Sequence, residues 1–447
     1  MTDETIHNPY HADYAEDSVT VPFAGRKQAL GRLYQQLNDP AADHALLILG
    51  HRRVGKTTFL RNFDALYGDA YAGVYINLQE APPENLEAFV LTLAQNATQM
   101  LVEREFTVRR LADLEPPADD PESWFATTFL PHIFSAIRPH RDLVFLIDDV
   151  DRLIFAVKQG RLPASLFKMM QSWLTQFKQL NFVLTMDTEY ESEISALAPL
   201  TSDQQMVRIG HLAPDETRWI MQEPIRGVYS VTDDAVTQIH RATGGMPGLV
   251  QHAGYQMFRR WYVAPDNRVF TAEDAKQIIP IVYDYGEPDF RVAWGKLSLN
   301  ERLVLTAISG LSYENPLRLI DPAEIESWLV ETDYPMDLMT INAILRSLEY
   351  REVIANAPDG VRIISGMWQT WLLDNAQIVE RTPEPIRKNN PSRVASPPLG
   401  KMLTIAIVVG VILAILILLI ISGNSAQNEA DLARTLIQPT VTLFVQP

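Results

Sequence analysis

The stretch Gly50-His51-Arg52-Arg53-Val54-Gly55-Lys56-Thr57 has the pattern G-x-x-x-x-G-K-[ST] of a phosphate-binding loop. An apolar run, Ala45–Leu49, precedes this loop, and a helix-compatible segment, Thr58–Leu66, follows it. Glycines let the backbone N–H groups face phosphate oxygens, and a helix beginning near Lys56 adds its positive dipole end. Lys56 is expected to reach the β- and γ-phosphates, and the Thr57 hydroxyl is expected to ligate Mg²⁺. The predicted nucleotide contacts are Gly50, Arg53, Gly55, Lys56, Thr57 and Thr58.

A second apolar run, Leu143–Ile147, ends in the acidic stretch Asp148-Asp149-Val150-Asp151. A buried strand here would deliver Asp148 beside the Mg²⁺ of a bound nucleotide. The next acid, Asp149, would then be placed to orient or deprotonate the attacking water. Asp151 is predicted to be the N-cap of the helix that follows.

Apolar strand-like runs alternate with helical patterns from Phe23 to about Ala264. The predicted strands are Ala45–Leu49, Gly73–Leu78, Leu143–Ile147 and Phe182–Met186, and two of the predicted helices are Glu84–Glu103 and Pro163–Lys178. Such alternation predicts an α/β fold with a parallel sheet covered by helices. Thr185 or Asp187, at the end of the fourth strand, would either sense the γ-phosphate or be an ordinary polar residue at a strand end.

The pattern from Phe290 to about Leu373 is mostly helical and closes with a predicted hairpin around Pro358-Asp359-Gly360. Asp-Gly is a strong hairpin turn signal, and helices followed by a small hairpin indicate a winged helix. The expected third helix, Asp337–Tyr350, has Arg346 as its only basic residue. DNA-reading helices usually carry several basic or amide side chains, so a protein-contact or regulatory role is favoured.

One segment, Met402–Ile421, contains twenty residues and no charge. A helix of this length spans roughly 30 Å, the thickness of a bilayer core, and predicts a membrane anchor. A linker precedes it and carries more basic residues than the tail at 422–447, which predicts a cytoplasmic N-terminal region. The start of the chain is polar and acidic, unlike a signal peptide.

The overall composition is that of a globular protein, with 47% hydrophobic and 21% charged residues among 447. The net charge of −17 disfavours broad, non-specific binding to nucleic acid. The chain has no cysteine, which excludes disulfides, zinc–thiolate sites and thiol catalysis.

Several motifs together give the chain a resemblance to a known family. In order, they are Asn8-Pro9-Tyr10, Phe23-Ala24-Gly25-Arg26, Arg52-Arg53, Asp148-Asp149, Arg208-Ile209-Gly210-His211-Leu212-Ala213-Pro214-Asp215-Glu216 and Gly244-Gly245-Met246-Pro247. From about Asn8 to Leu373 the chain resembles the STAND ATPases, signal-transduction NTPases related to AAA-type and archaeal origin-recognition ATPases. The resemblance implies that Phe23, Gly25 and Arg26 lie near the adenine. It also implies that Gly245 and Pro247 close a lid over the nucleotide and that Arg208 contacts phosphate.

These observations predict a membrane-anchored, ATP-binding and ATP-hydrolysing signalling switch, with ATP and Mg²⁺ as cofactors and Lys56 and Asp149 as catalytic residues. A protein partner or self-association is expected, and nucleic acid is not. Slow turnover is expected, because many related ATPases carry Glu where this chain has the shorter Asp149. The alternatives are a DNA-binding ATPase resembling origin-recognition proteins and a nucleotide-binding scaffold that does not hydrolyse ATP. The predicted parts are an N-terminal arm (1–22), an ATPase core (23–205), a helical lid (206–289), a winged helix (290–375), a linker (376–401), a transmembrane helix (402–421) and a tail (422–447).

Overall fold

The computed structural model describes residues 7–10, 23–39, 45–68, 70–80, 82–104, 119–137 and 142–376. All of them belong to one compact unit, Met1–Glu380. The expected linker, transmembrane helix and tail lie outside the described residues. Within the ranges given above, no helix combines the length and the apolar character needed to cross a membrane.

The core of the unit alternates strands and helices as the sequence predicts. Its strands are β1 (Leu46–Gly50), β2 (Tyr71–Asn77), β3 (Asp142–Asp148), β4 (Leu180–Asp187) and β5 (Met206–Arg208). Its α-helices are α1 (Lys27–Asn38), α2 (Lys56–Arg61), α3 (Phe63–Tyr67), α4 (Leu86–Glu103), α5 (Pro121–Trp124), α6 (Leu130–Ile137), α7 (Asp151–Lys158) and α8 (Leu166–Gln176). Other helical segments are the π-helical η1 (Phe125–Phe129) and the 3-10 segments η2 (Thr188–Leu197) and η3 (Asp203–Gln205).

The five strands form one parallel sheet in the order β2-β3-β4-β1-β5. The four predicted strands are all present, whereas the three-residue β5 is too short to give a periodic signal in the sequence. Register pairs Gly50 with Asp187 and Asn77 with Asp148. The carboxyl ends of these strands therefore meet at one edge, where parallel α/β sheets bind their ligands.

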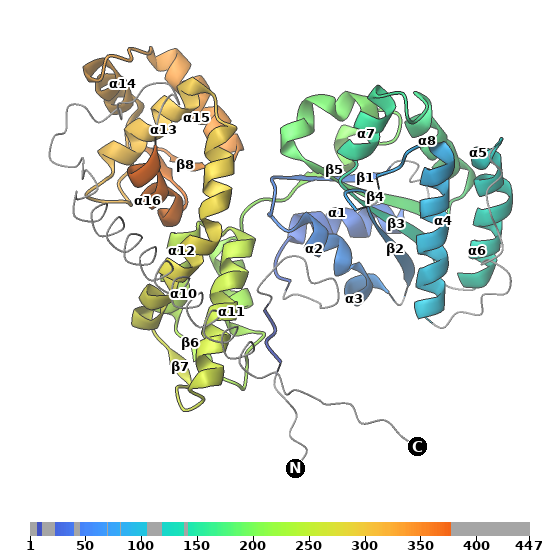
Figure 1. Cartoon of the computed structure of the whole chain (residues 1–447), viewed down its shortest axis with the longest axis horizontal. Coiled ribbons are helices and arrows are strands. Elements are labelled where there is room, and N and C mark those ends of the chain that lie inside the picture. Colours follow the sequence, from blue (N-terminus) through green and yellow to red (C-terminus); the bar gives the residue numbers. More distant parts are fainter. Residues whose placement is uncertain are drawn as a thin grey trace, which may run out of the picture. The chain divides into compact units, whose positions relative to one another are not determined.

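Helices cover both faces of the sheet (Figure 1). Leu47 and Leu49 of β1 pack in a core with α4, α6 and α8, while Leu46 and Ile48 pack in a second core with α1, α2 and α3. Burial on both faces explains why the strands read as continuous apolar runs rather than alternating ones.

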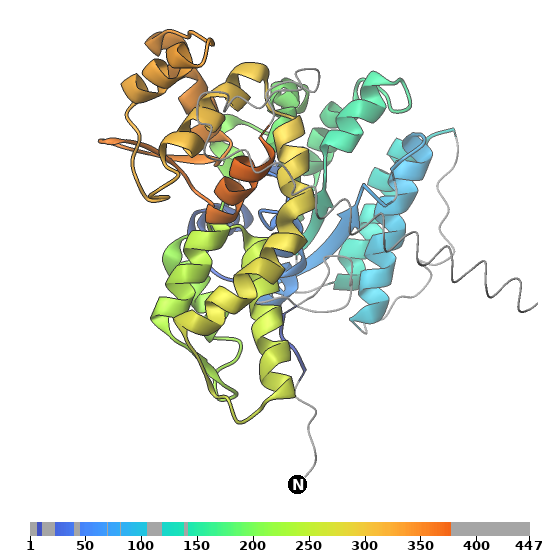
Figure 2. The same cartoon turned by 60° about the vertical axis from the view of Figure 1, so that its left-hand side comes forward.

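Beyond β5 the chain forms a helical region. It contains α9 (Pro214–Gln222), β6 (Ser230–Val231), α10 (Asp233–Thr243), α11 (Pro247–Val263), β7 (Val269–Phe270) and α12 (Ala272–Gly295). Both views show α12, in yellow, as one long helix (Figures 1 and 2). It runs without a break through the expected domain boundary at 289/290.

The last part of the unit contains α13 (Leu299–Leu311), α14 (Pro322–Glu331), α15 (Leu338–Tyr350), β8 (Ile354–Ala357), β9 (Gly360–Ile363) and α16 (Gly366–Asn375). The predicted hairpin is confirmed, because β8 and β9 pair antiparallel. Asp337 caps α15 by accepting a hydrogen bond from the Thr340 N–H, which explains why the helix starts there.

Candidate functional site

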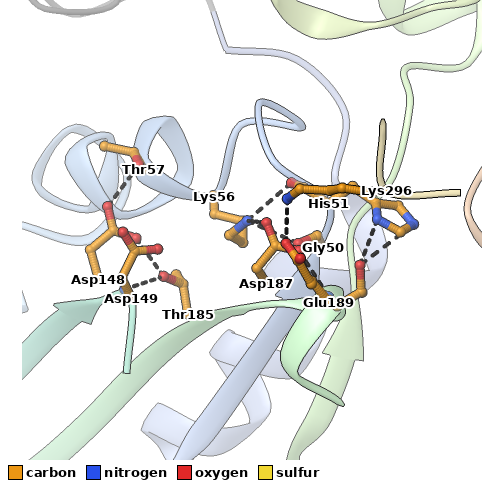
Figure 3. A network of polar contacts seen from close by, with 11 residues as sticks. Gly50, His51, Lys56, Thr57, Asp148, Asp149, Thr185, Asp187, Glu189 and Lys296 are labelled. Carbon is orange, nitrogen blue, oxygen red and sulfur yellow. Dashed lines mark hydrogen bonds and ion pairs between the residues drawn. The ribbon is translucent and has the colours of Figure 1, made fainter. Parts of the chain in front are cut away.

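The phosphate-binding loop connects β1 to α2, and Lys56 is the first residue of that helix. Gly55 has φ 94°, a left-handed conformation that glycine adopts without strain. The Lys56 ammonium folds back over the loop and donates to the carbonyls of Gly50 at 2.9 Å and His51 at 3.0 Å (Figure 3). It also lies 3.8 Å from a carboxylate oxygen of Asp187. The Lys56 ammonium is therefore hydrogen-bonded to the backbone of the predicted loop, at the carboxyl edge of the sheet.

The acid at the end of β3 lies beside the loop as predicted. Asp148 is 3% exposed, and its Oδ2 accepts a hydrogen bond from the Thr57 hydroxyl at 2.6 Å. Thr185 donates to the other carboxylate oxygen (Figure 3). This pair of oxygen donors suits Mg²⁺, which proteins usually hold through one or two side-chain oxygens together with substrate phosphates.

Asp149 turns out of the strand with φ 59°, and its N–H donates to the Thr185 hydroxyl at 3.0 Å. The Asp149 side chain lines the cavity described below. Burial and the neighbouring Asp148 carboxylate raise its pKa, which makes it a better proton acceptor than an ordinary aspartate.

The N-cap prediction for Asp151 is wrong. Val150 precedes the helix, and Asp151 is the first residue of α7 with a side chain that is 4% exposed. Its Oδ1 has no hydrogen-bond partner. Burial, followed by the charge of Asp149, raises the pKa of Asp151 to about 6. The capping interpretation therefore missed a buried carboxyl at the cavity wall.

The two sensor candidates on β4 lie in different environments. Thr185 is fully buried and uses its hydroxyl between Asp148 and the Asp149 backbone, so it supports the acidic edge. Asp187 lines the cavity near Lys56 and also accepts a hydrogen bond from the Glu189 N–H at 2.9 Å. Of the two, only Asp187 is placed to face a bound ligand.

A cavity of about 1070 Å³ opens at this edge of the sheet. Its lining includes many of the predicted contacts, namely Phe23, Arg26, Arg53, Gly55, Lys56, Thr57, Thr58, Asp149 and Pro247. Gly25, Gly50, Asp148, Arg208 and Gly245 do not line it. Sequence reasoning missed five lining residues from the helical region and the segment before it, namely Leu212, Ile220, Gly248, Gln251 and Tyr285.

Arg26 is buried and contacts the phosphate-binding loop, the segment after β5 and α9. Its backbone N–H donates to Glu216 at 3.0 Å, and its guanidinium donates to the carbonyls of Gly210 and Val54 at 2.5 Å each. A Cβ on Gly25 would lie 1.5 Å from the Glu216 carboxylate. Gly25 and Arg26 therefore hold the loop and the segment after β5 together.

Gly245 and Arg208 have local partners. Gly245, with φ 72°, accepts a hydrogen bond from the Leu212 N–H at 2.8 Å, and a Cβ there would lie 2.3 Å from the Leu212 carbonyl oxygen. The exposed Arg208 side chain pairs with Glu191 and stacks over the Tyr350 ring at 4.4 Å. The structure brings neither residue to the cavity wall, whereas Pro247 does lie there.

The phosphate-binding loop also contacts distant parts of the chain. Arg53 forms an ion pair with Asp289 of α12. Nε2 of His51 donates to the carbonyl of Tyr350, at the end of α15, at 3.2 Å. Lys296, just after α12, pairs with Glu189 at the cavity (Figure 3). None of these contacts has a sequence signal, because each joins residues more than 100 positions apart.

The fold of this chain is similar to that of a solved structure. The Walker-type ATPase paby2304 of Pyrococcus abyssi is 16% identical and has a TM-score of 0.54, with coverage of 78% of this chain and 96% of its own. Such a likeness shows the fold alone. Cdc6p of Pyrobaculum aerophilum (16% identity, TM-score 0.38, coverage 79% and 94%) and the Orc1 protein of Aeropyrum pernix in complex with DNA (14%, 0.37, 79% and 93%) are less similar, and they carry no functional argument. None of the curated proteins matches the sequence.

A family model described as "ATPase domain predominantly from Archaea" matches residues 23–253, just over half of the chain. The matched range includes the phosphate-binding loop, the acidic edge of β3 and Pro247. The chain therefore belongs to this family of ATPase domains predominantly from Archaea.

Proposed function

We propose that this protein is a membrane-anchored switch of the STAND type, which binds ATP with Mg²⁺, hydrolyses it slowly and reports the nucleotide state through its C-terminal helices. One observation carries the proposal. Two residues inside the phosphate-binding loop, His51 and Arg53, contact the C-terminal half of the unit at Tyr350 and Asp289. A ligand bound to the loop would therefore be linked to the elements that would transmit the signal through the contacts of His51 and Arg53.

The contacts suggest how nucleotide binding in the loop is linked to a change in the C-terminal helices. In the structure, Lys56 donates to the carbonyls of Gly50 and His51. A phosphate group would compete for that ammonium and for the loop N–H groups. If Lys56 left the His51 carbonyl, the conformation of the loop would change. The same loop contacts Tyr350 through His51 and Asp289 through Arg53. A ligand shifts a conformational equilibrium only by such differential contacts.

The catalytic assignment rests on the acidic edge. Thr57 and Asp148 would hold Mg²⁺, which would neutralise charge on the phosphates. Asp149 lies at the cavity wall with a raised pKa, as a base for water requires. Measuring phosphate release with and without Mg²⁺ tests this assignment. Release no faster than background would favour the non-hydrolysing scaffold instead.

Membrane attachment rests on the sequence at Met402–Ile421. The basic residues of the preceding linker, Arg387, Lys388, Arg393 and Lys401, favour a cytoplasmic ATPase region. Protease added to spheroplasts is expected to remove a C-terminal tag and spare an N-terminal tag. The reverse pattern would overturn this topology.

Hydrogen–deuterium exchange of the full chain in detergent, with and without Mg²⁺ and ATP, tests the switch. Nucleotide is expected to change exchange at the ends of α12 and α15, far in sequence from the loop. Asp289→Asn is expected to weaken that response, because it removes the charge that pairs with Arg53. Asp284→Asn, an exposed change on the same helix, is the matched control. An identical response in both variants would contradict the proposed coupling.

A DNA-binding ATPase remains the second candidate function. It is favoured by α15, which precedes the β8–β9 hairpin and exposes Asn342 and Arg346 one turn apart. The exposed Glu349 and the net charge of −17 oppose it. We expect no duplex-DNA binding at physiological salt. Sub-micromolar, sequence-dependent binding that Arg346→Ala weakens would favour the DNA-binding function.

A further inference from the structure

Three hydroxyl groups from three different elements surround the carboxylate of Asp148. Oδ1 accepts a hydrogen bond from Thr185 of β4. Oδ2 accepts two, from Thr57 of α2 at 2.6 Å and from the Tyr75 phenol of β2 at 3.0 Å. The sequence pattern assigns roles to Thr57 and Asp148, whereas nothing in it assigns one to Tyr75.

The sheet register explains how Tyr75 reaches the acid. Parallel pairing of β2 with β3 places Tyr75 opposite Leu146, two residues before Asp148. Paired residues point to the same face of a sheet, so the side chains of Tyr75, Leu146 and Asp148 share the face that α2 covers. A phenol is long enough to extend from there to the carboxyl end of β3.

A second contact holds the ring in this orientation. The Arg61 guanidinium, on α2, lies over the Tyr75 ring at 5.1 Å from its centroid. A cation at this distance from an aromatic face is attracted by the ring quadrupole. Both side chains line the nucleotide cavity, and α2 carries Thr57 as well. The phenol is thus fixed between the helix that follows the loop and the acid that faces it.

The Tyr75 hydroxyl is the donor in its contact with Asp148, because a phenol carries its proton at physiological pH and a carboxylate can only accept. A phenylalanine would keep the ring and its contact with Arg61 but would remove this donor.

We infer that Tyr75 is a positioning residue that fixes Oδ2 of Asp148 for the Mg²⁺ that accompanies the nucleotide, an inference that rests on the proposed function. The Thr57 hydroxyl has to serve both the metal and Asp148, so its hydrogen bond alone does not fix the carboxylate. The Tyr75 hydroxyl, from a different element, donates to the same oxygen. Groups that orient metal-binding side chains in this way typically contribute 10- to 100-fold to metal affinity.

Calorimetric titration of the full chain with ATP, in EDTA and at a series of Mg²⁺ concentrations, tests the inference. Tyr75→Phe is expected to leave the affinity in EDTA within about twofold of wild type, because Lys56 and the loop are untouched. The Mg²⁺ concentration that gives half of the affinity gain is expected to rise about tenfold. This readout measures binding and does not depend on turnover.

Tyr71→Phe is the matched control. Tyr71 lies on the same strand, and the substitution removes the same hydroxyl group. That hydroxyl donates to the Leu37 carbonyl at 3.1 Å rather than to Asp148. Thermal unfolding of both variants checks that the fold is kept. Equal Mg²⁺ dependence in wild type and both variants, or an equal loss in both variants, would overturn the inference. A wild-type affinity that does not respond to Mg²⁺ would instead overturn the metal assignment in the proposed function.

Discussion

Glu352 accepts a hydrogen bond from the His211 backbone N–H with both of its carboxylate oxygens, at 3.1 Å each. The glutamate follows α15 and has φ 56°, a left-handed conformation that is uncommon outside glycine. His211 lies in the segment after β5. The carbonyl of the residue before it, Gly210, accepts a hydrogen bond from the Arg26 guanidinium. Arg26 in turn donates to Val54 in the phosphate-binding loop. A continuous set of hydrogen bonds thus joins the C-terminal region to the loop.

Gly210→Ala is expected to break the contact between Glu352 and His211, because a Cβ there would lie 1.7 Å from Oε1 of Glu352. The loss of a hydrogen bond to a charged group should cost about 1.5–3 kcal/mol, measured by urea unfolding. Glu352→Ala is expected to have a similar effect, and the double variant should lose little more than either single one. Gly31→Ala, where a Cβ would meet nothing within 4 Å, is the control. Additive losses would show that the two residues act independently.

Lys56→Ala is expected to weaken ATP binding by about 10- to 100-fold, since a charge-assisted bond to the phosphates is lost. Calorimetry measures the effect directly. Lys158→Ala, which removes an exposed lysine paired with Glu193, should leave the affinity unchanged. An unchanged affinity in Lys56→Ala would contradict the assignment of the loop.

Asp149→Asn is expected to keep nucleotide affinity and to abolish hydrolysis, because an amide of the same size accepts no proton. A loss of about 10²- to 10⁴-fold in single-turnover phosphate release is typical for a general base. Asp149→Glu, one methylene longer, serves as the comparison and should retain activity. Equal rates in wild type and Asp149→Asn would assign the base to another group.

Asp151→Asn is expected to raise the melting temperature of the nucleotide-free protein more at pH 7 than at pH 4. The folded protein holds the Asp151 proton up to a pKa of about 6, whereas an ordinary aspartate loses it near 3.8. Stability therefore falls as pH rises between these values, and the neutral amide avoids that loss. The gap between variant and wild type should open between pH 4 and pH 6 and then level off. A gap that stays constant with pH would contradict the raised pKa.

The local parts of the site could be predicted from the sequence, because they depend on neighbouring residues. The loop pattern and the acids after an apolar strand placed Lys56, Thr57 and Asp148 together, as the structure shows. The hairpin also followed from local turn chemistry, at Asp359-Gly360. These features need no knowledge of how distant segments pack.

The rest could not be predicted, because it depends on register and packing. Tyr75 is an ordinary aromatic residue in a strand until its register with β3 brings it to Asp148. Asp151 follows a strand, as an N-cap would. The structure shows that the helix begins at Asp151 and that this residue is buried in the first turn. Arg208 matched a family position, but its side chain pairs with Glu191 outside the cavity.

The unbroken course of α12 has a consequence for how the contacts with the ATPase core would separate. Tyr285 lines the cavity, Asp289 pairs with Arg53, and Lys296 at the helix end pairs with Glu189. At about 1.5 Å per residue these positions are spaced roughly 6 Å and 10 Å along one helix. Pro280 and Pro288 lie inside α12, but the helix continues through both of them to Gly295, so a large movement at one contact would displace the others as well. Opening is therefore expected to be all-or-none, so that intermediate nucleotide levels would change the fraction of open molecules rather than the degree to which each one opens.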